Sequence, residues 1–280
     1  MTLDGKVKRC KEIIKNCDSA VVAFSGGVDS SVLCKIGHDV LGDKIVAVTA
    51  ISKTYPAGEA SFALEIAKKI GIEHMALSSN ELSNPEFTSN SPERCYHCKR
   101  ELMDKMNDVR KALKFKKILE GTNADDLEDY RPGVKALKEA KAVSPLAEAG
   151  LTKSEIRKLA KKYKLPVFDK PATPCLASRI PFGQPVTVEK LERIALAELI
   201  LHKLGFKVAR ARDYGNRVRI EVEKGKVERA VELNDKITEY MNKVGYEKIE
   251  IDPEGYKVCG ANPEYANKTK KRKQPTSRTP

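Results

Sequence analysis

An apolar strand that runs through a glycine-rich turn into a helix constrains this chain more than any other feature. Residues 19–24 (SAVVAF) have the small and β-branched composition of a buried strand, and residues 30–40 have helical periodicity. Between them stands the segment Ser25-Gly26-Gly27-Val28-Asp29-Ser30. Its glycines permit a sharp turn whose backbone amides close around an anion at the helix N-terminus. The segment predicts a phosphate site, and a plain Gly-Ser turn is the alternative.

The segment is not a Walker loop, because the chain contains no GxxxxGK[ST] string and an acidic residue, Asp29, takes part instead. SGGVDS after an apolar strand resembles the signature of the PP-loop ATP pyrophosphatases, a class that includes GMP synthetase, NAD synthetase and the tRNA thiolases. The resemblance implies that the loop holds the β- and γ-phosphates of ATP while the α-phosphate is attacked. It also implies that Asp29 helps to hold Mg²⁺.

The rest of the chain predicts two folded parts. Strands expected at 44–50, 72–77 and 117–120 alternate with helices at 58–70 and 100–112, which is typical of an α/β fold with a parallel sheet and helices on both faces. Thr152 and Glu155 form a capping-box pattern for a helix to residue 163. After Pro171 the expected elements are helices at 188–204 and 226–244 and strands at 217–222 and 248–252. We expect a PP-loop domain (1–170), a smaller α+β domain for substrate binding and oligomerisation (171–262) and a basic disordered tail (263–280).

Composition limits the cellular context. The chain has no run of about 18 apolar residues, and its N-terminus is too charged for a signal peptide, so we expect a cytoplasmic protein with no membrane association. In a reducing compartment its seven cysteines are thiols, metal ligands or catalytic groups rather than disulfides. The formal net charge of +13 favours anionic partners, but residues 267–280 alone supply six basic residues. That tail is a nucleic-acid arm or, more simply, a solvated tail.

Three cysteines stand out by position. Cys95 and Cys98 form a CxxC in a segment expected to precede a helix, and Cys175 lies between a proline and small residues. A structural zinc site would lack a fourth ligand, and a redox pair would lack its usual thioredoxin-like context. An iron–sulfur cluster held by three thiolates would leave one iron open to carry an additional sulfide. The remaining cysteines receive no role: Cys10, Cys17, Cys34 and Cys259.

Residues 5–260 resemble the LarE family, sulfur transferases that build the nickel-pincer nucleotide cofactor of lactate racemase. The resemblance rests on SGGVDSS (25–31), ERCYHCK (93–99), GTNADDLEDYRPG (121–133), PCLASRIPFG (174–183) and GFKVARARDYGNRVRIEV (205–222). It implies that ATP adenylates a carboxylate of pyridinium-3,5-biscarboxylic acid mononucleotide and that sulfur from sulfide or another donor then replaces the activated oxygen. It further implies the branch that uses a [4Fe-4S] cluster on Cys95, Cys98 and Cys175, and assembly as a homo-oligomer.

The resemblance also implies roles for charged residues. Arg210 and Arg212 alternate on one expected strand, so both side chains leave the same face and can grip a substrate phosphate; a solvated basic face is the alternative. Arg179 and Lys99 match substrate-region positions. Glu198 and Glu221 match acidic positions linked to metal or substrate. Apart from the resemblance, an acidic loop follows the strand expected at 117–120, at the strand end where open α/β sheets bind ligands, so Asp126 or Asp129 can contact Mg²⁺ or ribose. An acidic surface turn would look the same.

Three other functions compete with this one. A tRNA thiolase pairs the same loop with three cysteines, but the chain has no recognisable RNA-binding module, so a nucleic-acid partner is not expected. A non-catalytic nucleotide sensor that stores iron would release no pyrophosphate. An ammonia-using ligase would leave the three cysteines without a purpose.

Overall fold

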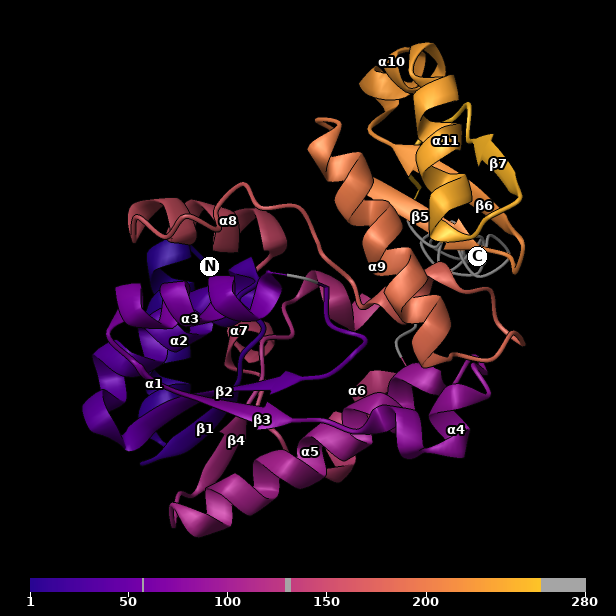
Figure 1. Cartoon of the computed structure of the whole chain (residues 1–280). Coiled ribbons are helices and arrows are strands. Elements are labelled where there is room, and N and C mark those ends of the chain that lie inside the picture. Colours follow the sequence, from indigo (N-terminus) through magenta and orange to yellow (C-terminus); the bar gives the residue numbers. More distant parts are fainter. Residues whose placement is uncertain (57, 129–131, 258–280) are drawn as a thin grey trace, which may run out of the picture. The chain divides into compact units, whose positions relative to one another are not determined.

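The computed structural model describes residues 1–56, 58–128 and 132–257, which form two compact units (Figure 1). Unit 1 comprises Met1–Glu81 and Glu93–Thr173, and unit 2 comprises Leu82–Pro92 and the described residues from Pro174 to Lys257. The segment Leu82–Pro92 therefore belongs to unit 2, which a simple division at residue 170 does not anticipate. The tail expected at 263–280, Cys259 and Asp129 lie outside the described residues.

The sheet of unit 1 has four parallel strands in the order β3-β2-β1-β4. Val21 of the central strand lies opposite Val46 on one side and Ile118 on the other. This arrangement confirms the expected α/β class with a parallel sheet. The strands are β1 (Ala20–Ala23), β2 (Ile45–Ile51), β3 (Glu73–Ser78) and β4 (Lys117–Leu119).

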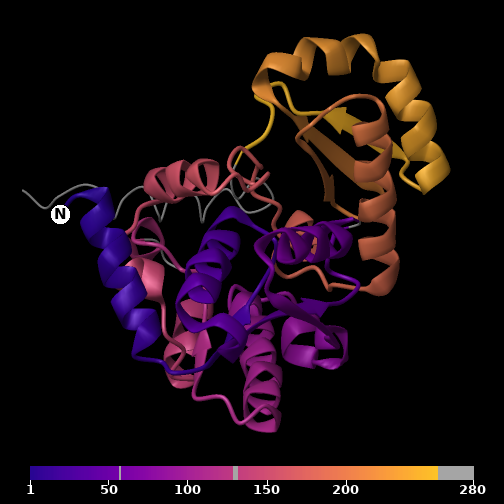
Figure 2. The same cartoon turned by 90° about the vertical axis from the view of Figure 1, so that its left-hand side faces the viewer.

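Helices cover both faces of this sheet (Figures 1 and 2). Successive residues of a strand point to opposite faces, so Val22 and Ala47 join one core cluster while Val21 and Val46 join the other. The first cluster contains α1 (Leu3–Lys15), α2 (Val28–Leu41), α3 (Glu59–Ile70), α7 (Pro145–Glu148) and α8 (Lys153–Lys162). The second contains α5 (Arg94–Ala112) and α6 (Gly133–Glu139).

Helix α5 begins earlier than the sequence indicates. Its first residue is Arg94, so Cys95 and Cys98 lie inside the helix and not in a segment before it. The N-cap residue Glu93 makes no side-chain capping bond, and the first turn is polar, so neither signal of a helix start is present in the sequence. A spacing of three residues places the two thiols on neighbouring positions of one helix face.

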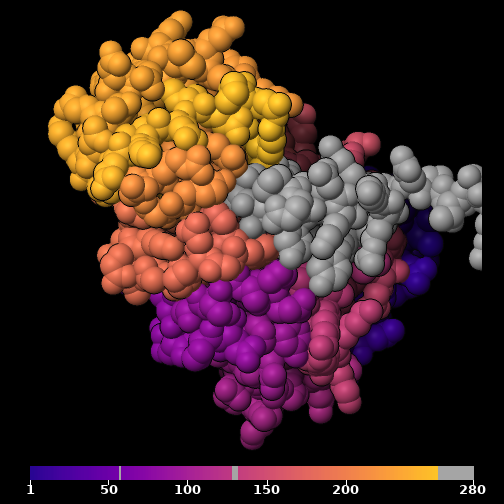
Figure 3. Space-filling model, turned by 90° about the vertical axis from the view of Figure 1, so that its right-hand side faces the viewer, coloured from indigo at the N-terminus to yellow at the C-terminus, as the bar shows by residue number. Residues whose placement is uncertain are grey.

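Unit 2 contains a three-stranded mixed sheet in the order β5-β6-β7, with β5 antiparallel and β7 parallel to β6. Its core lies between this sheet and the long helices, and Figure 3 shows its surface in orange and yellow. The helix expected at 226–244 is broken at Leu233 into two. The elements are α4 (Pro85–Thr88), α9 (Val188–Lys203), β5 (Ala209–Asp213), β6 (Arg217–Val222), α10 (Val227–Glu232), α11 (Asn234–Val244) and β7 (Lys248–Ile251).

The segment Leu82–Pro92 is fixed within unit 2 by side-chain contacts. Asn90 is fully buried, and its amide donates hydrogen bonds to the carbonyl oxygens of Pro181 and Gln184, each at 2.8 Å. Phe87 on α4 is also buried, at 1% exposure. Across the described ranges of both units, no helix is long and apolar enough to cross a bilayer.

Candidate functional site

The glycine-rich loop between β1 and α2 has the geometry of an anion cradle. Gly26 has a φ of +67°, and a Cβ atom there would lie 2.9 Å from the Cα atom of Ala63 in α3. Only glycine fits this position without strain. Gly27 is the N-cap residue of α2, and no side chain caps that helix end. The first amides of the helix are therefore arranged as they are in phosphate sites.

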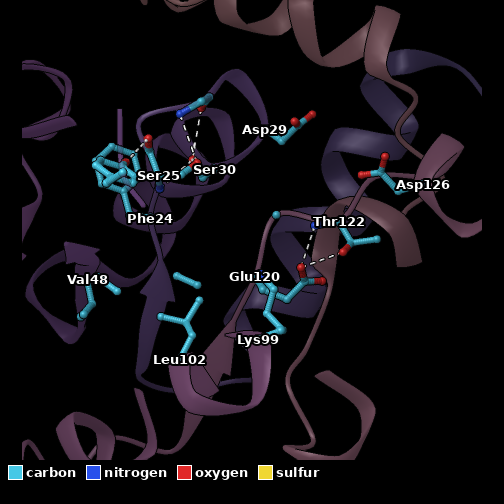
Figure 4. Close-up of a pocket in the computed structure, with 15 residues that line it drawn as sticks. Phe24, Ser25, Asp29, Ser30, Val48, Lys99, Leu102, Glu120, Thr122 and Asp126 are labelled. Atoms are coloured by element: carbon cyan, nitrogen blue, oxygen red, sulfur yellow. Dashed lines mark hydrogen bonds between the residues drawn. The ribbon is translucent and has the colours of Figure 1, made fainter. Parts of the chain in front are cut away.

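The serines of the loop hold it in shape. Ser30 Oγ accepts a hydrogen bond from the amide of Ser25 at 3.3 Å and lies 3.2 Å from Ser25 Oγ. Ser25 Oγ in turn accepts the amide of Gly27 at 3.3 Å. Figure 4 shows both serines at the pocket that this loop borders. The loop is thus organised by its own residues before any ligand contacts it.

This pocket has a volume of about 370 Å³ and lies within unit 1. That volume is within the range typical of small-molecule sites. Strands β1 and β2, the phosphate loop, the start of α2, helix α5 and the segments around Tyr55 and after β4 supply its walls. The lining residues are Ala23 to Ser25, Gly27, Asp29, Ser30, Val48, Ala50, Tyr55, Lys99, Leu102, Glu120 to Thr122, and Asp126. The pocket opens at the carboxyl ends of the parallel strands, where open α/β sheets bind ligands. Six residues expected at the site from the sequence therefore line one pocket: Ser25, Gly27, Asp29, Ser30, Lys99 and Asp126.

Lys153 brings a positive charge to the phosphate loop, and sequence reasoning missed it. Its Nζ atom forms an ion pair with Asp29 Oδ2, although 124 residues separate the two positions. The Lys153 amide donates to Asp125 Oδ2 at 2.8 Å, which fixes the start of α8 beside the loop. A Walker loop carries its lysine within its own sequence. Here a lysine of a distant helix, α8, lies beside the loop, so no local pattern could have revealed it.

The acidic loop after β4 is tied to Asp29. Asn123 is 2% exposed, and its amide nitrogen donates to Asp29 Oδ1 at 3.3 Å. Its amide oxygen accepts the backbone amides of Asp125 and Asp126 at 3.0 and 3.2 Å. Asp126 and Asp29 both line the pocket. Carboxylate oxygens are the ligands that Mg²⁺ prefers, so their position suits a magnesium ion bound with nucleotide phosphates.

A buried carboxylate orders the loop that supplies Tyr55 to the pocket. Glu81 is 3% exposed and accepts hydrogen bonds from the hydroxyls of Ser52, Thr54 and Ser79 at 2.5, 2.6 and 2.7 Å. Burial raises the pKa of Glu81, but these bonds outweigh it and leave the pKa below its ordinary value. The loop that Glu81 holds carries Tyr55.

Tyr55 connects that loop to the phosphate loop. Its hydroxyl donates to the carbonyl oxygen of Ser25 at 2.9 Å. Burial and the neighbouring Glu59 raise the pKa of Tyr55 to about 12, so the hydroxyl stays protonated and remains a donor. Neither Tyr55 nor Glu81 has a motif that would have marked it in the sequence.

The six cysteines of the described residues fall into two groups. Cys10, Cys17 and Cys34 are buried, and burial raises the pKa of each thiol, that of Cys10 to about 12. Cys95 is exposed, and Cys98 and Cys175 are partly exposed. The accessible group consists of the three cysteines expected to have a role, the first two in unit 1 and Cys175 in unit 2. Thiolate chemistry requires sulfur that a ligand or substrate can reach, and a raised pKa disfavours the thiolate of the buried group.

The arginines expected at the substrate are buried in unit 2. Arg210 and Arg212 share one face of β5, as expected from their alternation, and lie opposite Glu221 and Arg219 of β6. Arg212 is 3% exposed and donates to Glu221 Oε2 at 2.7 Å and to the carbonyl oxygen of Ser178 at 3.1 Å. Its Nε atom is buried without a hydrogen-bond partner among the described residues.

Two further residues predicted for the site, Arg179 and Glu198, contact each other in unit 2. Arg179 is fully buried and forms a two-bond ion pair with Glu198. Burial, and after it the charge of Arg179, lowers the pKa of Arg210. Within the described residues no three His, Cys, Asp or Glu side chains are grouped so as to hold a metal ion. The metal-ligand roles expected for Glu198 and Glu221 therefore stay predictions.

Comparison with known proteins identifies the family of this chain. A family model described as asparagine synthase matches residues 18–127. An uncharacterized protein of Synechocystis sp. is 40% identical over 91% of this chain and 96% of its own length. A glutamine-hydrolyzing GMP synthase subunit of Methanocaldococcus jannaschii is 28% identical over 72% of this chain and 68% of its own. The pyridinium-3,5-bisthiocarboxylic acid mononucleotide synthase of Lactiplantibacillus plantarum is 31% identical over 91% of this chain and 93% of its own. Because that similarity spans nearly the full length of both chains and includes the phosphate loop, this chain belongs to the LarE family of PP-loop proteins.

Proposed function

We propose that this chain is an ATP-dependent sulfurtransferase that converts carboxylates of pyridinium-3,5-biscarboxylic acid mononucleotide to thiocarboxylates, as a step in nickel-pincer nucleotide synthesis. One observation carries the proposal. The SGGVDSS loop borders a pocket at a helix end that no side chain caps, in a chain 31% identical along 91% of its length to a bisthiocarboxylic acid mononucleotide synthase. A cytoplasmic location and a homo-oligomeric assembly stay predictions.

Activation of the carboxylate requires ATP in the pocket of unit 1. In this proposal the amides and hydroxyls of residues 25–30 hold the β- and γ-phosphates, Asp29 and Asp126 bind Mg²⁺, and Lys153 adds a cation. A substrate carboxylate oxygen attacks the α-phosphorus, the bond from that phosphorus to the bridging oxygen breaks, and pyrophosphate leaves. The carboxylate carbon becomes an electrophile because its oxygen is now part of an AMP leaving group.

Recognition of the substrate is assigned to cationic side chains. The buried Nε atom of Arg212 has no hydrogen-bond partner in the described part of the chain, and a phosphate oxygen is a suitable acceptor for such a donor. Arg210 lies on the same face of β5. We assign both to the phosphate of the mononucleotide, and Lys99 in the pocket of unit 1 to the carboxylate that is activated.

Sulfur delivery is assigned to Cys95, Cys98 and Cys175. Their accessible thiols have the donor chemistry of an iron–sulfur cluster, whereas the buried thiols with raised pKa values do not. When bound to three thiolates, a [4Fe-4S] cluster supplies an iron atom without a protein ligand, at which sulfur chemistry can take place. Sulfide from an external donor forms the new carbon–sulfur bond, and AMP leaves with the original oxygen.

The test separates activation from sulfur transfer. Pyrophosphate exchange into ATP is measured with and without the biscarboxylated mononucleotide, and thiocarboxylate is counted per chain after anaerobic reconstitution with iron and sulfide. Wild type, Cys175→Ala and the control Cys10→Ala are compared. We expect nucleotide-dependent exchange in all three proteins. We expect more than one product per chain in wild type and Cys10→Ala, and none in Cys175→Ala.

Two results would overturn the proposal at different steps. If no exchange depends on the mononucleotide, the activation step is wrong; tRNA thiolated in its place would identify an RNA-modifying enzyme. If Cys175→Ala forms product repeatedly at the wild-type rate, the cysteines do not deliver sulfur and the cluster assignment fails.

A further inference from the structure

A buried ion pair in unit 2 holds the turn that carries Cys175 in place through hydrogen bonds. Arg179 ends the short 3-10 helix Leu176–Arg179 and has a side-chain exposure of 0%, while that of Glu198 on α9 is 7%. The two side chains meet through Nε to Oε1 at 2.7 Å and Nη2 to Oε2 at 2.8 Å. Such a fork is the strongest geometry for an arginine and a carboxylate, and burial prevents water from competing with it.

The remaining arm of the guanidinium reaches the backbone on both sides of Cys175. Arg179 Nη1 donates to the carbonyl oxygen of Pro174 at 2.7 Å and to that of Cys175 at 3.1 Å. It also donates to Ser178 Oγ at 3.0 Å. The two carbonyls belong to the peptide groups that flank the Cα atom of Cys175, so Arg179 fixes the direction in which the thiol leaves the backbone.

Glu198 anchors this arrangement to the sheet. Its Oε1 atom, besides accepting from Arg179, accepts the backbone amide of Ala211 in β5 at 3.1 Å. Ala211 lies between the two arginines of β5 that are assigned to the substrate phosphate. One carboxylate therefore connects the cysteine turn to the strand that carries those arginines. Oε1 of Glu198 accepts two hydrogen bonds and Oε2 accepts one from a fully buried guanidinium, so a Mg²⁺ ion at Glu198 would have to break a buried ion pair.

We propose that Arg179 and Glu198 are positioning residues that set the backbone of Cys175 relative to β5, and not ligands of the nucleotide or of Mg²⁺. The role of Cys175 in sulfur transfer rests on the proposed function, whereas the hydrogen bonds that hold the Cys175 turn do not depend on it. Removing either charge is expected to loosen the turn because the partner charge is left buried and only partly compensated.

The test uses the full chain with Arg179→Lys, which keeps the charge but loses the fork, and Glu198→Gln, which keeps the shape but loses the charge. The control is Asp213→Asn. Asp213 is another buried carboxylate of unit 2, bonded to Arg193 and Tyr246 and, in the described part of the chain, not hydrogen-bonded to the Cys175 turn. Thermal unfolding of all variants separates general destabilisation from a local effect.

Backbone amide exchange in cluster-free protein is the first readout. Ser178 donates its amide to the carbonyl of Cys175, and Ile180 donates to that of Ala177. We expect exchange in the peptide that spans these residues to accelerate about tenfold or more in both variants and not in Asp213→Asn. Equal amide exchange in the two variants and the control would refute the claim that Arg179 and Glu198 hold the Cys175 turn, whatever reaction the protein catalyses.

The second readout distinguishes positioning from ligand binding. For a positioning pair, the KM of the mononucleotide in pyrophosphate exchange stays within about twofold of wild type, while thiocarboxylate formation falls about tenfold or more and the EPR spectrum of the reconstituted protein changes. A KM raised about tenfold with wild-type amide exchange would make Arg179 a substrate ligand and would refute the proposal. A failure of wild-type pyrophosphate exchange refutes the proposed function alone, because the amide-exchange result stands without it.

Discussion

Gly26 and Gly27 are adjacent glycines in the phosphate loop. The structure predicts that an alanine is poorly tolerated at Gly26 and well tolerated at Gly27. Gly26 has a φ of +67°, and its new Cβ atom would meet the Cα and Cβ atoms of Ala63 at 2.9 and 3.0 Å. Gly27 has an ordinary φ of −78°, and its new Cβ atom would meet only Ser25 Oγ, at 3.3 Å. One substitution strains the backbone and pushes α3 away, whereas the other displaces a movable side chain.

The expected cost follows from these contacts. A left-handed conformation costs a residue with a Cβ atom about 1–2 kcal/mol, and overpacking costs about 1–3 kcal/mol more. Gly26→Ala should therefore lower the free energy of unfolding of unit 1 by about 2–5 kcal/mol. Gly27→Ala should lower it by less than about 1 kcal/mol, because only a side chain must move.

Amide exchange in the peptides of β1 and β2 is the appropriate assay, because it reports the opening of unit 1 without a signal from unit 2. The chain has no tryptophan, so fluorescence offers no simple substitute. Gly26→Ala should accelerate that exchange about 30-fold or more, since about 1.4 kcal/mol corresponds to a factor of ten. If the two alanine variants exchange equally, the loop does not have the geometry described here and the argument for a phosphate cradle is refuted.

Two other predictions concern residues that sequence reasoning missed. Lys153→Gln should raise the KM of Mg·ATP in pyrophosphate exchange about 10- to 100-fold, because it removes a cation from the phosphates. The control Lys35→Gln removes a surface ion pair between Lys35 and Asp39 within α2 and should change that KM less than about twofold. Equal effects of the two substitutions would contradict a role for Lys153. Because the pKa of Glu81 is lowered in the folded state, its stabilising contribution is present above the ordinary value of 4.5 and is lost as the pH falls through the folded pKa. The stability difference between wild type and Glu81→Gln in urea titrations should therefore shrink below about pH 4.5, and a difference that grows there would contradict the hydrogen-bond network.

Local patterns in the sequence predicted the features that local forces determine. The strand, turn and helix around Gly26 follow from composition and periodicity, and the capping box of Thr152 and Glu155 is present in the structure as expected. The start of α5 was misplaced because no capping side chain or apolar periodicity marks Arg94. The ion pair of Lys153 with Asp29 was not predictable, since it depends on how α8 packs beside α2 and not on any neighbouring residue.

The path of the chain between the two units has a consequence for how the protein can be divided. The chain enters unit 2 at Leu82, returns at Glu93 and enters it again at Pro174. A truncation after Thr173 would keep Asn90 but remove Pro181 and Gln184, whose carbonyl oxygens accept its hydrogen bonds. Unit 1 is therefore not a single continuous segment that one cut could release. An isolated unit 1 would need a designed linker in place of residues 82–92.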